Sequence, residues 1–411
     1  MQQVTNQQRL KPWMGFVLFA LLMVYFIFVC VPMQTAWGIW GLIATEVSFL
    51  VIAIVYGLIF RISLKEMFPI KKFTARDFFG GIFLVIGGTL IGLISVAVIA
   101  ILVPSALEGG DVEAITDMMI SGPGYILLML IIAVMPAICE EAIHRGAILT
   151  SFRSIKKDWV IVLIMAVFFG INHMSVLRFI NTAILGACLS YVVVKKNNIL
   201  LSSIMHFTVN FSASTISYIA SLFLKKYMDS GLSGSDIASA MGSGAMRNAL
   251  PAYLFYGAAA PILIVLGLML LNPSSHKKIR FLFAGIISVL MLSSAIGLAV
   301  FSASSAKVLQ STVNYKVTAE NTEAPALDLD IEEDGDYTLI CVLMQSDGIY
   351  YAKITDERGN VVSENEIPAG SIRTLTANMH LESGKYKLIL VNGKGTVGDN
   401  PTFSIQMKKL G

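Results

Sequence analysis

Residues 125–152 read YILLMLIIAVMPAICEEAIHRGAILTSF and place four ionisable side chains directly after a long apolar run. These side chains are Glu140, Glu141, His144 and Arg145. In a soluble protein the pattern would be an ordinary charged face of a helix. At membrane depth ionisable residues are costly, and those that occur there usually serve a function. The stretch therefore predicts a membrane-spanning helix that carries a functional site.

The composition of the whole chain agrees with a membrane protein. Of its 411 residues 55% are hydrophobic and only 14% are charged, whereas soluble domains carry about 25% charged residues. The formal net charge of +3 and the lack of a basic stripe with interleaved aromatic residues argue against nucleic-acid binding. The partner indicated by composition is the lipid bilayer of a cell membrane.

The four cysteines are scattered, at Cys30, Cys139, Cys188 and Cys341. No CxxC pair or zinc-type spacing is present. Neither a disulfide framework nor a cysteine-based metal site is therefore predicted.

The apolar segments are each long enough to cross the hydrocarbon core as a helix, which needs about 20 residues. Helices are expected because the runs are too long and continuous for barrel strands. The segments predict an all-α polytopic bundle of about eight or nine transmembrane helices within a domain at 1–305. They lie at about 13–33, 37–60, 78–103, 122–150, 159–176, 178–194, 198–224, 250–271 and 280–301.

Lysine and arginine predict the orientation, because cytoplasmic loops carry an excess of these residues. Basic stretches occur in alternate connections, at the N-terminus, 61–76, 153–157, 195–196 and 276–280. The opposite loops are acidic or neutral, except for the pair Lys225–Lys226. We expect the N-terminus in the cytoplasm and, with an odd number of spans, the C-terminal domain outside the cell.

Residues 310–411 differ abruptly from the membrane domain. Short alternating stretches such as DYTLICVLM and KYKLILVNG are separated by turn signals such as Asp334-Gly335, which is typical of β-strands. We expect an all-β sandwich that binds an extracytoplasmic ligand or stabilises the protein. Its pattern is similar to jelly-roll domains appended to secreted enzymes. His380 stands alone, so no catalytic role is expected there.

Two further apolar segments contribute polar side chains at helical spacing. His173 follows Phe169 by four residues, and Asn210 follows His206 by four. Residues four apart share one face of a helix. His206 lies shallower in its span than Glu140, which a tilted or unwound helix would accommodate. Each side chain alone has a structural explanation as an interhelical hydrogen-bonding residue, but their coincidence in three spans favours a functional site.

The three motifs resemble the ordered motif set of the CPBP family. They are EExxxR (Glu140, Glu141, Arg145), FxxxH (Phe169, His173) and HxxxN (His206, Asn210), within about 120–215. The family comprises the type II CAAX prenyl endopeptidases and the bacterial Abi proteins, which act in bacteriocin processing and immunity. The ordered trio is a much more specific signal than any single motif.

The resemblance implies an intramembrane endopeptidase acting on a membrane-embedded or membrane-associated peptide. Glu140 matches the general base that activates water, assisted by His173. Glu141 and Arg145 match the positions that hold the first motif in shape. His206 and Asn210 match the positions that stabilise the oxyanion.

The residues themselves are compatible with this chemistry, because peptide hydrolysis needs a base and donors to the oxyanion. No cofactor is required. A zinc alternative would use Glu140, His173 and His206 as three ligands with water as the fourth, but HExxH is absent. His144 lies outside the family pattern, and we interpret it as a polar neighbour lining the same cavity.

Two other functions remain open from the sequence. Buried glutamate and histidine side chains could form the relay of a proton-coupled carrier, although no inverted repeat is evident. The chain could also be a non-catalytic immunity or scaffold membrane protein. Neither the substrate nor its cleavage site can be read from the residues.

Overall fold

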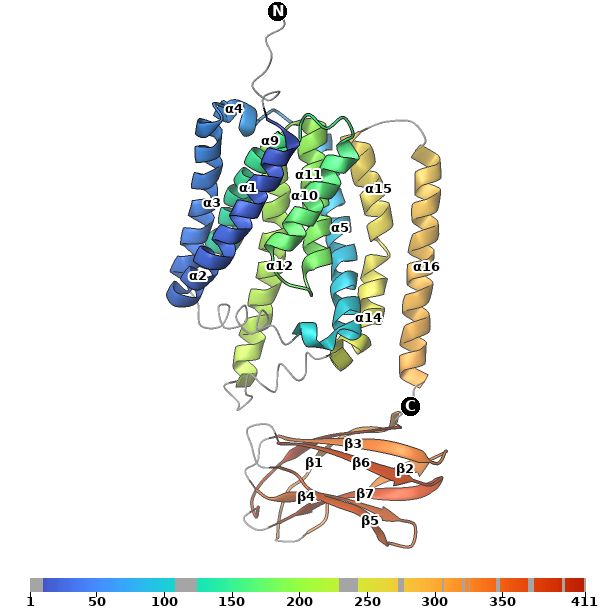
Figure 1. Ribbon diagram of the computed structural model, residues 1–411. Helices are drawn as coiled ribbons and strands as arrows, with labels where there is room; N and C mark the ends of the chain where they lie inside the picture. The colour runs from blue at the N-terminus through green and yellow to red at the C-terminus, as the bar shows by residue number, and fades with distance from the viewer. Residues whose placement is uncertain are drawn as a thin grey trace, which may run out of the picture. The chain divides into compact units, whose positions relative to one another are not determined.

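The computed structural model describes residues 10–107, 124–228, 243–272, 277–304, 307–319, 322–324, 326–344, 348–368, 373–393 and 396–409. The chain divides into two compact units (Figure 1). One contains the apolar helices as far as Ile296, and the other contains the chain from Gly297 onward. Each unit is described separately below.

The first unit is a bundle of apolar helices, as the sequence predicts. Eight helices are long and apolar enough to cross a membrane. They are Pro12–Trp37 (α1 and α2), Ile39–Ile59 (α3), Ala75–Leu102 (α5), Tyr125–Ser151 (α7 to α9), Phe179–Lys196 (α11), Ile199–Leu222 (within α12, Ile199–Met228), Ala249–Leu271 (within α14 and α15, Ser243–Gly257 and Ala260–Leu271) and Lys278–Val300 (within α16, Lys277–Ser304).

A ninth apolar helix is shorter than the others. It is α10, Asp158–Asn172, with 15 residues, and it corresponds to the predicted segment 159–176. The loop after α10 returns the chain to α11, and the two helices form an antiparallel hairpin (Figure 1). The hairpin begins and finishes at the same end of the bundle. It therefore does not change the end from which the following helices start.

Connections at one end of the bundle are held together by polar contacts. The helix α5 begins with a capping box, in which the Asp77 N–H donates to Thr74 Oγ1 at 3.2 Å. Lys196 at the end of α11 pairs with Asp77 at 2.6 Å, and Asn198 Nδ2 donates to Lys71 O at 2.7 Å. The basic stretches 61–76 and 195–196 therefore meet at one end, as their alternation predicts. Which side of the membrane this end faces stays a prediction.

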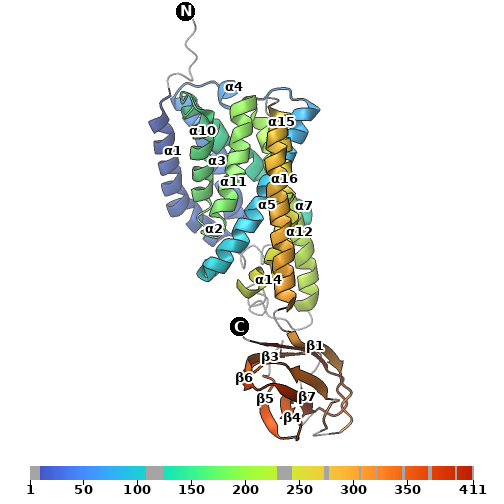
Figure 2. The same cartoon turned by 90° about the vertical axis from the view of Figure 1, so that its right-hand side faces the viewer.

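Glycines bring α5 close to α11 (Figure 2). A Cβ at Gly88 would lie 2.8 Å from Cys188 Sγ, and a Cβ at Gly92 would overlap the side chain of Asn181. Both contacted residues belong to α11. The small-xxx-small spacing of α5 thus serves close helix packing.

The helix that carries the first motif is the most enclosed of the bundle. In the apolar window of Tyr125–Ser151 56% of the residues are buried, against 11–39% in the other seven spans. The short α-helix α8, Met135–Glu141, lies between two π-helical segments, Leu130–Val134 and Ala142–Ile148. Pro136 follows the first of them. Such segments occur often at functional sites because they re-aim side chains within a helix.

The second unit is a sandwich of two four-stranded antiparallel sheets, which confirms the predicted all-β domain. The strands are β1 (Lys307–Asn314), β2 (Leu327–Ile331), β3 (Gly335–Met344), β4 (Tyr350–Asp356), β5 (Val361–Glu366), β6 (Arg373–Leu381), β7 (Gly384–Asn392) and β8 (Thr402–Lys409). The sheet orders are β1-β8-β3-β6 and β2-β7-β4-β5, the arrangement of a jelly roll. Alternate residues of both sheets fill the core between them.

The description of His380 as isolated is wrong. Its Nδ1 lies 2.8 Å from Asp336 Oδ1, because β3 and β6 pair these two residues directly across the ladder. Both side chains are about two-thirds exposed. The pair is a cross-strand contact on the surface of the sheet.

Asn392 at the end of β7 ties the loops at one end of the sandwich together. It is fully buried, and its amide donates to Ala319 O at 2.9 Å and to Thr396 Oγ1 at 2.8 Å. Asn392→Ala would leave these acceptors without a donor. We expect a loss of about 1–3 kcal/mol in the stability of this domain.

Amide hydrogen exchange of β4 and β7 in the full-length protein measures this loss. Asn378→Ala is the matched control, because Asn378 accepts its hydrogen bond from Thr338 on the exposed face. We expect exchange in that variant to match wild type. Equal protection in the Asn392 variant would contradict a structural role for this cluster.

Candidate active site

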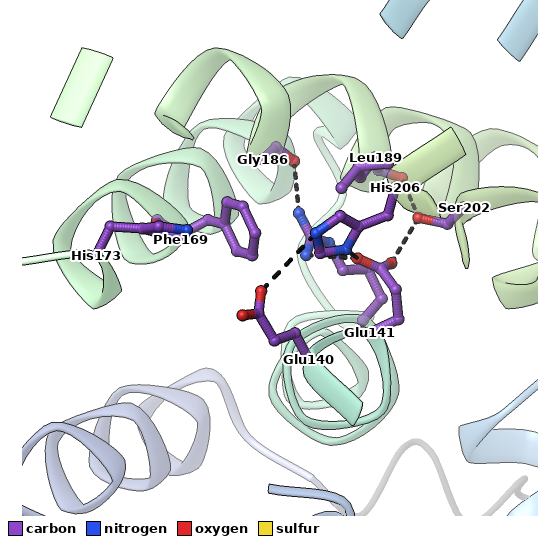
Figure 3. Close-up of polar contacts among 9 residues, drawn as sticks. Glu140, Glu141, Phe169, His173, Gly186, Leu189, Ser202 and His206 are labelled. Carbon is purple, nitrogen blue, oxygen red and sulfur yellow. Dashed lines mark hydrogen bonds and ion pairs between the residues drawn. The ribbon is translucent and has the colours of Figure 1, made fainter. Parts of the chain in front are cut away.

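Three membrane helices deliver the polar side chains of the predicted site. Glu140, Glu141 and Arg145 lie on the helix containing α8, Phe169 lies on α10, and His206 lies on α12. Figure 3 shows the side chains of Glu140, Glu141, Phe169 and His206 converging between the helices. The site is therefore assembled by contacts between residues far apart in sequence, such as Glu141 and His206, which are 65 residues apart.

Glu141 is the centre of the hydrogen-bond network. Its Oε1 accepts from Arg145 Nη1 at 2.8 Å and lies 3.0 Å from His206 Nδ1. Its Oε2 accepts from Ser202 Oγ at 2.6 Å. The carboxylate, Arg145 and the Ser202 side chain are all fully buried. One carboxylate thus links the first motif helix to α12 (Figure 3).

Arg145 makes two further contacts besides the carboxylate. Its Nη2 donates to Gly186 O on α11 at 3.3 Å. Its guanidinium carbon lies 4.4 Å from the centre of the Phe169 ring, a cation–π contact that is favourable away from water. A fully buried ion pair is tolerated when such additional contacts offset desolvation. Arg145 therefore joins the motif helix to both helices of the α10–α11 hairpin.

Glu140 projects to the other side of its helix from Glu141 (Figure 3). Consecutive residues are about 100° apart on an α-helix, so only one of the two can face Arg145. The Glu140 side chain is 14% exposed, and its Oε2 lies 3.9 Å from His206 Nε2. That separation is too long for a hydrogen bond, and Oε2 has no hydrogen-bond partner among the described residues.

The contacts of His206 fix the roles of its two nitrogens. Glu141 pairs with Arg145 and can only accept hydrogen bonds while ionised, so His206 Nδ1 donates to it. The other nitrogen, Nε2, then points toward Glu140. The helix α12 is continuous around His206, so the site forms without unwinding of this helix.

Phe169 stands at the centre of three histidines. Its ring is 5.2 Å from His144, 4.9 Å from His173 and 5.7 Å from His206, each in an edge-to-face arrangement. His173 ends α10, and its Nδ1 lies 2.8 Å from Phe169 O. That carbonyl can only accept, so Nδ1 carries the proton and Nε2 is left free. His173 lies within electrostatic range of Glu140.

Two polar residues make no hydrogen bond within the described part of the chain. Asn210 is half-buried one turn after His206 on α12, and its predicted role therefore stays a prediction. His144 is fully buried, and neither of its ring nitrogens has a partner there. It packs against Phe169, so it is enclosed in the protein beside the site.

Comparison with known proteins agrees with the site. Residues 122–212 match the family model described as type II CAAX prenyl endopeptidase Rce1-like. The matched range contains all three motifs and every residue of the network around Glu141. This segment is similar to the Rce1-like family. At a coarse level, the similarity supports an intramembrane protease of the CAAX type.

Other comparisons add little to this assignment. No curated protein matches the chain. Among solved structures, a carbohydrate-binding module from Cellvibrio mixtus lichenase 5A, CBM6cm-2 in complex with cellotriose, is 15% identical. The match covers 26% of this chain and 92% of that chain, with a TM-score of 0.19. A TM-score this low supports no inference about the fold or ligand of the β-domain.

The described residues give no support to the zinc alternative. Within them, no group of three or more His, Cys, Asp or Glu side chains is placed to hold a metal ion. His206 and His173 each use Nδ1 for another partner, Glu141 and Phe169 O respectively, which leaves Nε2 of each ring for a ligand. No catalytic step is derived through a metal.

Two residues near the site have no counterpart in the sequence-based prediction. Ser202 bonds Glu141, and its position four residues before His206 could have indicated a shared helix face. Glu46 is a buried carboxyl group in the middle of α3. A single acidic residue in an otherwise uncharged 21-residue helix is itself a signal of function at membrane depth.

Proposed function

We propose that the chain is an intramembrane endopeptidase that hydrolyses a peptide bond of a membrane-associated protein or peptide. Glu140 activates the attacking water. The observation that carries this proposal is the pair of facing atoms, Glu140 Oε2 and His206 Nε2, 3.9 Å apart. Both belong to the segment that matches the Rce1-like family.

In the proposed reaction Glu140 takes a proton from water as the water oxygen bonds to the substrate carbonyl carbon. The carbonyl oxygen becomes an oxyanion. The carbon–nitrogen bond then breaks, and Glu140 returns the proton to the leaving amine. Glu140 thus acts first as a general base and then as a general acid. His173, with its free Nε2, assists in orienting the water.

His206 stabilises the oxyanion from Nε2. Because Nδ1 already donates to Glu141, this role requires a second proton on the ring. Asn210 supplies a second donor if its amide turns toward the substrate, since it has no competing hydrogen bond within the described residues. Phe169 fixes the His206 ring from one side.

Cleavage of membrane-tethered peptides by the purified protein in liposomes tests the proposal. We expect His206→Ala to lower kcat by about 10²–10³-fold, the effect of removing one oxyanion donor. Asp77→Asn, at the distant end of α5, serves as the control and should cleave like wild type. A strong chelator should leave wild-type activity unchanged. Equal cleavage by folded His206→Ala and wild type would overturn the assignment.

The topology makes a separate prediction. The basic connections place the N-terminus in the cytoplasm and the β-domain outside. Protease added to intact cells should therefore digest the segment 307–409 while leaving the helices protected. Digestion of that segment only after the cells are lysed would reverse the orientation.

A further inference from the structure

Glu46 is the one charged residue of α3, whose sequence is IWGLIATEVSFLVIAIVYGLI. It is 3% exposed and lies on the buried face of the helix, together with Phe49 and Ala53. Phe49, Ala53, Cys139 and Ala142 belong to one buried cluster. This face of α3 therefore packs against the helix that carries Glu140.

A hydrogen bond sets the register of these two helices. Tyr56 OH on α3 lies 2.8 Å from Ser151 Oγ at the end of the motif helix. Glu46 comes ten residues before Tyr56, and Glu140 comes eleven residues before Ser151. Both helices run in the same direction (Figure 1). At a rise of about 1.5 Å per residue the two carboxyl groups lie at similar depth, roughly 15 Å below the Tyr56–Ser151 contact.

The electrostatic surroundings agree with this register. Glu46 lies within electrostatic range of Glu140, and Cys139, which precedes Glu140 on the motif helix, lies within range of both carboxyl groups. Glu46 forms no ion pair or hydrogen bond with any described residue, and its Oε2 is buried without a partner. Glu140 Oε2 likewise has no hydrogen-bond partner among the described residues, although His206 Nε2 lies 3.9 Å from it. Two packed helices thus each carry, at similar depth, a carboxyl group with one buried oxygen that lacks a hydrogen-bond partner among the described residues.

We propose that Glu46 is a positioning residue for Glu140, and that the two carboxyl groups share one proton. Two neighbouring carboxylates away from water cannot both remain ionised, and one proton held between them satisfies both unpartnered oxygens. Glu46 retains this proton and donates a hydrogen bond to Glu140, directly or through one water. Glu140 accepts this hydrogen bond and takes the proton of the attacking water.

This inference rests on the proposed function for its kinetic consequence. Glu140 has no other hydrogen bond among the described residues that would hold its carboxylate toward His206. Loss of the donor on Glu46 would leave Glu140 free to turn away from the substrate. A displacement of about 1 Å at a reacting group can cost about 10²-fold in rate.

Two substitutions at Glu46 separate positioning from packing. Glu46→Gln keeps a neutral donor of the same shape, whereas Glu46→Leu keeps only the volume. We expect Glu46→Gln to keep kcat within about tenfold of wild type, and Glu46→Leu to lower kcat about 10²-fold with KM unchanged. Wild-type turnover in folded Glu46→Leu would show that Glu46 only fills space. Equal loss in both variants would show that a neutral donor is not what Glu140 needs.

Infrared spectroscopy of the purified protein tests the shared proton without any assay of cleavage. Wild type at neutral pH should show the carbonyl stretch of a protonated, buried carboxylic acid. This band should disappear in Glu46→Gln and persist in Asp77→Asn. The same band in wild type and Glu46→Gln would overturn the inference. Absence of cleavage by wild type, with the band behaving as expected, would instead remove the proposed function alone.

Discussion

Glu140→Gln is expected to lower the rate of peptide cleavage by about 10²–10⁴-fold, the contribution of a positioned general base. Glutamine has the shape of glutamate but cannot take a proton from water. The fold should be unaffected, because glutamine keeps an oxygen that can accept a hydrogen bond and Glu140 meets His206 only at 3.9 Å. The measurement is kcat/KM of the purified variant in liposomes.

A matched carboxylate at the end of the bundle provides the control for this substitution. Asp158 at the start of α10 pairs with Lys195 at 2.6 Å, where both side chains are partly exposed. Asp158→Asn should retain wild-type kcat/KM. A folded Glu140→Gln variant with wild-type kcat/KM would remove Glu140 from the reaction.

Glu141→Leu is expected to destabilise the membrane unit by about 3–5 kcal/mol, the cost of leaving one charge of a buried ion pair without its partner. Arg145 is fully buried and donates to Glu141 at 2.8 Å. Ser202 and His206 would lose their acceptor in the same substitution. Unfolding can be followed by a thiol-reactive dye, because the free cysteines of the helices, such as Cys139 and Cys188, are buried.

A double variant tells whether the ion pair causes this loss. In Glu141→Leu with Arg145→Met no buried charge remains, and replacing a buried ion pair by apolar residues is often neutral. We expect the double variant to recover much of the stability lost in the single variant. A double variant less stable than either single variant would contradict the coupling.

The fold of the membrane unit could be predicted because bilayer thickness acts on each helix locally. Each apolar run had to form a helix whatever its neighbours, and eight long helices are present with a ninth short one. The break between the predicted segments 159–176 and 178–194 is present, but α10 ends at Asn172, four residues earlier than predicted. The end of a helix is the least reliable feature of such a prediction.

The sequence predicts those contacts of the site that are local, but not those between helices. The pairing of Glu141 with Arg145 was predicted from helical spacing, and it is confirmed. The contacts of Glu141 with Ser202 and His206 cross between helices, so no local pattern could show which carboxylate each would meet. The same holds for Glu46, whose neighbour Glu140 depends on how α3 packs. The catalytic roles of His173 and Asn210 stay predictions.

The β-domain illustrates the same limit. Alternating residues predicted strands and a sandwich. The strand order depends on the pairing of β1 with β8, the first and last strands of the domain in sequence. The contact of Asp336 with His380 depends on the register of β3 and β6. Period-two alternation identifies which face a residue occupies, but not its neighbour on the next strand.

Hydrolysis by water at Glu140 is the claim on which the mechanism depends. Single-turnover cleavage of a membrane-tethered peptide in ¹⁸O-labelled water, followed by mass spectrometry, measures it directly. The account predicts one ¹⁸O atom in the new carboxyl group with wild-type protein, and no product above background with Glu140→Gln. Labelled product from Glu140→Gln at the wild-type rate, or unlabelled product from wild type, would contradict it.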